Sequence, residues 1–184
     1  MNESTIYSIG HGAKTFNDFF EELSSFQIQY LIDVRSQPYS KWNPEFNKEI
    51  LEQKMAKTNI RYIYWGAILG GRPNDISCYT DNRIDYSKLR QKDFFIDGIS
   101  RIIIANEKQI RVAVMCSEAN PAICHRSKCI GQDLLSKGIS MHHIVGPNKS
   151  KSQELVMAEL TKGLGIVDLF GQEESFMSIK EYTI

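Results

Sequence analysis

Apolar and polar residues follow two different spacings along the chain, and each spacing predicts one kind of element. Short runs rich in β-branched and aromatic residues predict five strands, at 5–9, 29–34, 60–65, 110–115 and 141–145. Apolar residues that recur every three or four positions predict helices at 16–26, 44–55, 86–106, 121–137 and 152–160. The stretch from 66 to about 85 is predicted to be mainly a polar loop.

Residues that favour helix ends mark where several of these helices begin and stop. Thr15 is a predicted N-cap, and Asp18 three positions later gives a weak form of the capping box. Asn43-Pro44 and Asn120-Pro121 each place a capping side chain before a proline, which is a frequent start of a helix. Gly138 is a natural residue to follow a helix end.

The order of the predicted elements sets the fold class. Strands and helices alternate five times, which favours a three-layer α/β/α fold with a single, mainly parallel sheet of about five strands and helices on both faces. Ligands of such open sheets bind beyond the carboxyl ends of the strands. We expect an α/β core domain at 1–148, followed at 149–184 by a C-terminal helix and tail that pack on the core or extend from it.

Composition narrows the class of protein further. The chain has 184 residues, of which 42% are hydrophobic, enough for one globular core. Its formal net charge is zero, so any polyanion must bind at a local patch. Residues 1–5 lack a secretory signal pattern, and no apolar run is long enough to span a membrane. Four cysteines are too few for a disulfide scaffold, so we expect reduced thiols in a cytoplasmic protein.

Chemically versatile residues follow three of the predicted strands. Gly10-His11 follows the first strand, Asp33 and Arg35 end the second, and Cys116-Ser117-Glu118 ends the fourth. Because the carboxyl ends of parallel strands meet at one edge of a sheet, these side chains are expected to share a site there.

The stretch MCSEANPAICHRS, residues 115–127, carries the most specific pattern in the chain. If Asn120 caps a helix, then Cys124, His125 and Arg126 fall in its first turn. The free N–H groups of that turn would bind an anion, and together with Arg126 they would lower the pKa of a nearby thiol. Cys116, at the tip of the strand, is the candidate nucleophile, and Cys124 is either a resolving thiol or a buried packing residue.

Two groups of candidate residues result. The expected catalytic residues are Cys116, His11, Asp33, Glu118 and His125. The expected anion-binding residues are Arg35, Arg126, Gly10 and Ser117. Each has a simpler alternative, such as a structural Asp33–Arg35 pair, a surface His125 or a polar turn at Glu118.

A metal site is a further alternative. Cysteines and histidines that bind zinc elsewhere occur at 116, 124, 125, 129, 142 and 143. Their spacing matches no zinc knuckle, so no metal and no cofactor are expected.

The layout of these motifs resembles the domain of unknown function 488 family. The resemblance covers about residues 5–146 and consists of Gly10-His11, the Asp33–Ser36 motif, the Leu69–Gly71 motif and the Cys116–Arg126 motif. It implies a small three-layer α/β fold and leaves the activity open. Gly12 stands where that family often carries serine.

Two partial resemblances point to other features. The D-V-R strand and the loop from Cys116 to Arg126 are similar to those of rhodanese and cysteine-phosphatase domains, in which loop N–H groups hold an oxyanion beside a cysteine. In this chain ten positions rather than six separate the cysteine from the arginine. Asp168, Leu169 and Phe170 are similar to the peptide with which proteins bind the bacterial sliding clamp; the alternative is that Leu169 and Phe170 dock on the domain.

These observations favour an enzyme that acts on a phosphorylated small molecule, a nucleotide or a nucleic acid at the carboxyl edge of the sheet. One alternative is a binding module that recognises a nucleotide or nucleic acid without turnover. Another is a protein that uses its thiols for redox chemistry or for metal binding.

Overall fold

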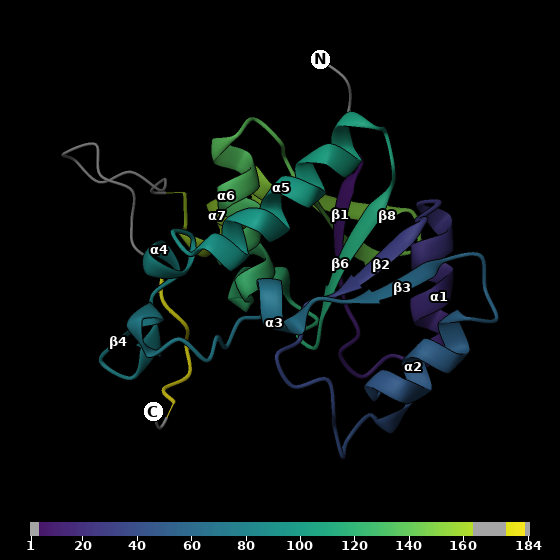
Figure 1. The fold of residues 1–184 in the computed structure, drawn as a ribbon. Helices are drawn as coiled ribbons and strands as arrows, with labels where there is room; N and C mark the ends of the chain where they lie inside the picture. Colours follow the sequence, from purple (N-terminus) through teal and green to yellow (C-terminus); the bar gives the residue numbers. More distant parts are fainter. Residues whose placement is uncertain (1–3, 164–175, 183–184) are drawn as a thin grey trace.

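The computed structural model describes residues 4–163 and 176–182 of the chain. Its centre is a six-stranded sheet with the strand order β3-β2-β6-β1-β7-β8 (Figure 1). The strands are β1 (Ile6–Gly10), β2 (Tyr30–Asp33), β3 (Arg61–Tyr64), β6 (Val112–Cys116), β7 (His142–Gly146) and β8 (Lys149–Ser152). The first five run parallel, and β8 pairs antiparallel with β7. The mainly parallel α/β fold is therefore confirmed, with one strand more than expected.

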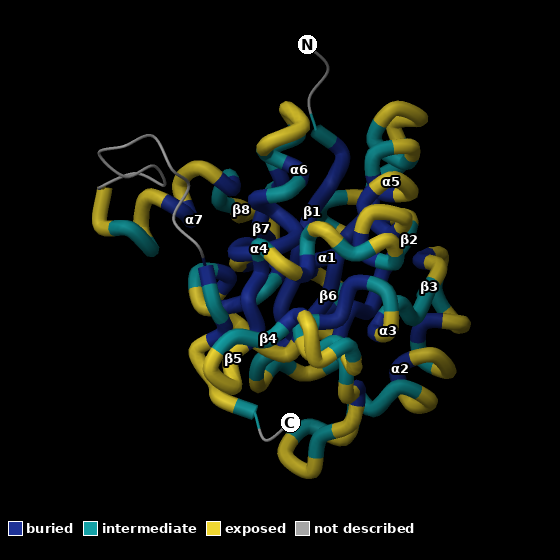
Figure 2. Tube along the Cα trace, turned by 60° about the vertical axis from the view of Figure 1, so that its left-hand side comes forward, coloured by how far each residue is buried: buried dark blue, intermediate teal, exposed yellow. Residues whose placement is uncertain are grey.

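Helices cover both faces of the sheet, as the three-layer prediction requires (Figure 1). The helices α1 (Phe16–Ser25) and α2 (Lys48–Met55) pack on one face, where Phe19 and Leu51 meet Ile9 in one core. On the other face lie α5 (Asp93–Glu107), α6 (Gln132–Ser136) and α7 (Gln153–Leu160), in a second core. The buried strands run between the two cores (Figure 2).

Helix α1 shows how closely local pattern and structure agree. Thr15 has an extended backbone and its side chain accepts a hydrogen bond from the N–H of Asp18, as an N-cap does. Phe19 and Leu23 are fully buried at helical spacing, and Phe16 and Phe20 are partly buried beside them.

The helix predicted at 121–137 is interrupted, and this changes the site. Asn120 caps only a single 3₁₀ turn, Pro121–Ile123, after which Cys124 is extended, with φ −106° and ψ 150°. A π-helical stretch, Arg126–Gly131, then leads into α6. In a continuous helix Cys124 and Arg126 would point about 200° apart, whereas here the Arg126 side chain reaches back to the Cys124 sulfur. The prediction of Cys124 in a first helical turn is therefore wrong.

The long helix predicted at 86–106 is also two elements. The short helix α4 (Tyr86–Leu89) is capped by Asp85, and α5 begins at Asp93. Phe95 is fully buried, and Phe94 is partly buried.

The stretch predicted as a loop at 66–85 contains regular elements too short for a spacing pattern. It holds α3 (Gly66–Leu69), a 3₁₀ turn at Ile76–Cys78, and a hairpin of β4 (Tyr79–Thr80) and β5 (Arg83–Ile84). Asp81 and Asn82 both have positive φ, the geometry of a two-residue hairpin turn.

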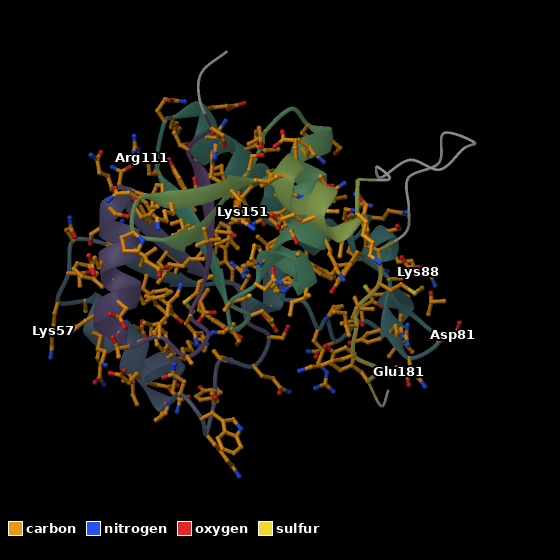
Figure 3. All side chains as sticks on the ribbon, turned by 180° about the vertical axis from the view of Figure 1, so that it is seen from behind. Lys57, Asp81, Lys88, Arg111, Lys151 and Glu181 are labelled. Atoms are coloured by element: carbon orange, nitrogen blue, oxygen red, sulfur yellow. The ribbon has the colours of Figure 1, made fainter. Side chains whose placement is uncertain are left out.

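Residues 176–182, which we call the C-terminal segment, lie along this hairpin. Met177 bridges Asp85, the N–H of Ser178 donates to the Ile84 carbonyl at 2.9 Å, and that of Tyr182 donates to Asn82 at 2.8 Å. The labelled Glu181 and Asp81 accordingly lie on the same side of the molecule (Figure 3). The segment is thus fixed to the domain.

Three points concern the ends and the surface of the chain. The predicted division of the chain into a core domain at 1–148 and a C-terminal part at 149–184 stays a prediction. Asp168, Leu169 and Phe170 lie outside the described residues. Within the described part, no helix has the length and apolar character that a membrane span needs.

Candidate functional site: a buried pair of thiols beside a cationic cavity

The carboxyl ends of β1 and β6 bring the candidate residues together. Gly10 is paired with Cys116 in the sheet register, and the N–H of His11 donates to the Cys116 carbonyl at 3.1 Å. A Cβ at Gly10 would lie 1.8 Å from the Glu118 carbonyl oxygen. Glycine is therefore required for the loop after β6 to close over β1.

Two cysteines form the centre of the site. The Sγ atoms of Cys116 and Cys124 are 2.9 Å apart, and both cysteines are buried and free. Cys116 Sγ also lies 2.8 Å from Glu118 Oε2, where its S–H donates to the carboxylate. The same oxygen lies 3.4 Å from Cys124 Sγ, so Glu118 is close to both sulfurs and nearer to Cys116.

The surroundings of Cys124 favour a thiolate. The Nε–H and the backbone N–H of Arg126 approach its sulfur at 3.3 and 3.5 Å, and His125 Nδ1 lies 3.6 Å away. Burial alone would raise the pKa of Cys124, but the Cys116 hydrogen bond and the charges of Arg126 and His125 lower it well below the usual value. Burial and the neighbouring Cys124 raise the pKa of Cys116. The electrostatics thus favour Cys124 as the ionised member of the pair.

The neighbours of His125 shift its pKa as well. Burial disfavours its imidazolium, but the Cys124 thiolate and Glu118 outweigh this and raise its pKa. Its Nε2 atom is buried and has no hydrogen-bond partner among the described residues. The ring packs closely on Gly71, where a Cβ would lie 2.7 Å from Nδ1. His125 is therefore held in place with one nitrogen unengaged.

Arg126 is fixed by a chain of buried polar groups. Its Nη2 donates to the Glu118 carbonyl at 2.6 Å and its Nη1 to Ser8 Oγ at 3.2 Å. Ser8 Oγ lies 2.7 Å from His143 Nδ1, and His143 Nε2 lies 2.7 Å from Gln153 Oε1. Gln153 Oε1 can only accept, so Nε2 of His143 carries the proton and Nδ1 accepts from the serine hydroxyl. Each donor is thereby matched with an acceptor.

The sequence pattern did not indicate Ser8 or Gln153, and it indicated His143 only as one of several possible metal ligands. The sequence contains one indication of this pair, because Ser8 and His143 are polar residues within two otherwise apolar strands. In the structure they are register partners of β1 and β7. Burial lowers the pKa of His143 to about 4, so the ring is neutral at physiological pH.

A second polar cluster holds Arg35. Asp33 accepts from Arg35 Nε at 2.9 Å and from Nη2 at 2.6 Å, and from the Tyr62 hydroxyl at 2.8 Å. Arg35 Nη1 lies 3.4 Å from His11 Nε2. Burial lowers the pKa of His11 to about 4, and the neutral ring stacks on Phe46 at 4.5 Å. Asp33 therefore positions Arg35, and His11 lies against the same guanidinium.

A cavity of about 600 Å³ opens beside the thiols. Its walls include five of the predicted site residues, namely Arg35, Cys116, Ser117, Glu118 and His125, and also Cys124. Gly10, His11, Asp33 and Arg126 do not line the cavity. The rest of the lining lies outside the predicted site and consists of the C-terminal segment together with Ser36, Gln37, Gly71, Arg72, Tyr86 and Ile123.

Few aromatic residues line the cavity. Tyr39, Trp42, Tyr64 and Trp65 do not line it. Tyr86 and Tyr182 do.

The same atoms offer a possible metal site. Donor atoms of Cys116, Glu118 and Cys124 lie within 4.8 Å of one another, and thiolates with a carboxylate suit zinc. The guanidinium 3.3 Å from Cys124 Sγ opposes a dication at this position. The donor set therefore suits zinc by atom type, and its local charge favours a thiolate without a metal.

Fold and site together define an α/β protein with a buried dithiol at the carboxyl edge of a parallel sheet. The chain belongs to the family described as Domain of unknown function DUF488, whose model matches residues 15–130. The matched range contains Arg35 and the whole Cys116–Arg126 motif, and it ends before the C-terminal segment. No curated protein and no solved structure was found to match the chain.

Proposed function

We propose that this protein is a thiol-dependent enzyme that acts on an anionic substrate in the cavity, either a phosphorylated small molecule, a nucleotide or a nucleic acid. The observation that carries the proposal is the environment of Cys124, whose sulfur faces Arg126 and His125 at the wall of a cavity of about 600 Å³. A thiolate stabilised in this way is a nucleophile at neutral pH.

The neighbouring residues have complementary roles in this proposal. Arg35, held by Asp33 and His11, binds the anionic group of the substrate. The Cys124 thiolate forms a bond to the electrophilic atom, the bond to the leaving group breaks, and the imidazolium of His125 gives that group a proton. Glu118 accepts a hydrogen bond from the Cys116 S–H and so keeps Cys116 protonated beside the Cys124 thiolate.

A second candidate function rests on the 2.9 Å between the two sulfurs. Cys124 as attacking thiolate and Cys116 as resolving thiol would form a disulfide when a peroxide accepts two electrons, and a dithiol would reduce it again. This reading predicts a mass loss of two hydrogens on oxidation and its reversal by thiols.

The test compares four proteins on a panel of phosphorylated, nucleotide and nucleic-acid substrates. Cys124→Ser is expected to lose roughly a thousandfold in turnover or more, since serine is not ionised at neutral pH. Cys129→Ala is the matched control, because Cys129 is also buried but lies in the core behind the site. Cys116→Ser separates the two functions: it abolishes disulfide formation and retains the Cys124 nucleophile. Full turnover by Cys124→Ser would disprove the proposal.

A further inference from the structure

The cavity has two walls of different character and different origin. The reactive wall consists of the thiols, Glu118 and His125, all within the range matched by the family. A second part of the lining, which we call the remote wall, comes from the C-terminal segment, with Ser178, Ile179, Lys180 and Tyr182, beyond the end of that range. The reactive half and the remote half of the cavity are therefore encoded by separate parts of the chain.

The remote wall is a fixed surface. Ser178 exchanges hydrogen bonds with Ile84, from N–H to carbonyl at 2.9 Å and from the Ile84 N–H to Ser178 Oγ at 3.0 Å. Phe176 is buried in the core, and Tyr182 is fixed at its backbone by Asn82. A ligand that enters the cavity would meet this wall already formed, at little cost in ordering.

Apolar side chains form part of the cavity lining. Ile123 is 48% exposed and Ile179 is 61% exposed, and both line the cavity. Tyr182 also lines it, and the Arg72 guanidinium lies 4.8 Å from the centroid of its ring. Two exposed isoleucines and a tyrosine ring match a flat, largely apolar group of a ligand.

Cationic side chains also belong to the cavity lining. Among the described lining residues, Arg35, Arg72 and Lys180 are cationic and Glu118 is acidic, and the charge of Arg35 is offset by Asp33 at 2.6 Å. The cavity thus combines apolar and cationic lining groups, and its volume of about 600 Å³ is in the range of small-molecule sites.

We propose that Ile123, Ile179 and Tyr182 form a base-binding subsite, so that the ligand of this cavity is a nucleoside phosphate. The phosphate lies at Arg35 beside the thiols, and Arg72 and Lys180 flank the base and sugar. The placement of the phosphate rests on the proposed function. The recognition of the base rests on the remote wall alone.

The test is calorimetric titration of the full chain with AMP, GMP, CMP and UMP, and with ribose 5-phosphate as the ligand that lacks a base. At least one nucleotide is expected to bind about tenfold or more tightly than ribose 5-phosphate, because base stacking on an aromatic ring contributes on that order. Ile179→Ala and Tyr182→Ala are expected to remove most of this preference, and Tyr182→Phe to retain it. Ile104→Ala, on the exposed face of α5, is the matched control.

Equal affinity for ribose 5-phosphate and every nucleotide would overturn the inference, as would a full nucleotide preference in both alanine variants. Absence of nucleotide binding would overturn it too. These outcomes test base recognition only, and a separate experiment tests the proposed function. A Cys124→Ser protein that turns over substrate disproves thiol catalysis, whatever ligand the remote wall selects.

Discussion

The two central cysteines show how neighbours decide the chemistry of identical side chains. Cys116 points its sulfur at the Glu118 carboxylate, which stabilises the neutral thiol as a donor. Cys124 meets the Arg126 guanidinium and the Arg126 N–H, which stabilise the thiolate. The position of Cys116 at the strand tip made it the candidate nucleophile in the sequence, whereas the cationic Arg126 lies beside Cys124, which is why we propose Cys124 as the nucleophile.

Alkylation of Cys124 by iodoacetamide tests this assignment directly. Because only the thiolate reacts, the rate rises with pH through the pKa of Cys124, and we expect the midpoint below the free-cysteine value of about 8.5. Arg126→Met removes the charge beside the sulfur and should move the midpoint upward. Peptide mass spectrometry assigns the modified cysteine. A midpoint at or above the free value in the unmodified protein would contradict the thiolate.

At the scale of elements, the site depends on the contact between the end of β1 and the loop after β6. That contact allows the Glu118 carbonyl to lie over Gly10 and to accept the bond from Arg126 Nη2 at 2.6 Å. The loop therefore orients both Glu118 and Arg126 relative to the thiols.

The substitution Gly10→Ala tests the contact between the end of β1 and the loop after β6. The new methyl group would lie 1.8 Å from a backbone oxygen, so the loop must move. We expect the free energy of unfolding to fall by about 3 kcal/mol or more, with the thiol pair disturbed. Gly138→Ala is the control: its φ is +79° with no atom within 4 Å of the new Cβ, so only backbone strain of about 1 kcal/mol is expected. Urea unfolding of both variants measures the difference, and equal losses would contradict the role of Gly10.

Elements with a strong spacing pattern could be predicted, and those without one could not. Strands β1, β2 and β6 and helix α1 have buried apolar residues where the spacing predicts them, so local sequence and burial agree. Strand β3 is a β-rich run without a fully buried residue. Strand β8 reads Lys-Ser-Lys-Ser and pairs only because β7 offers an edge. The break at Cys124 follows from long-range bonds of Arg126 to Ser8 and Glu118, which a local pattern does not contain.

At the scale of the whole molecule, the topology predicts that the site residues meet at one edge of the sheet. It does not predict which other residues line the cavity. Parallel strands end at one edge, so His11, Arg35 and Cys116 were expected together. The remote wall arrives from residue 176 onward, about fifty positions after the motif, and attaches through backbone bonds to β5. Backbone bonds carry no side-chain signature, so the sequence could not indicate this wall.

Two buried histidines, one against each core, couple the stability of the whole domain to pH. Burial lowers the pKa of both His11 and His143 to about 4 in the folded protein, against about 6.5 in the unfolded chain. Above pH 6.5 both states are neutral and stability is complete. Below it the unfolded chain binds protons that the folded protein cannot accept until about pH 4, so stability falls across this window.

Urea unfolding between pH 7 and pH 5 should therefore show a loss of about 2 kcal/mol for each of these histidines. His143→Gln removes one titrating group, so the variant is expected to be less stable at pH 7 but to lose only about half as much on acidification. His142→Gln is the control for the substitution itself, because His142 is partly exposed at the adjacent position and has no part in the buried chain from Arg126 to Gln153. A slope equal to that of the unmodified protein in His143→Gln would show that the buried chain from Arg126 to Gln153 tolerates a charged imidazole. In that case the assigned direction of its hydrogen bonds would be wrong, since a protonated His143 would donate to Ser8.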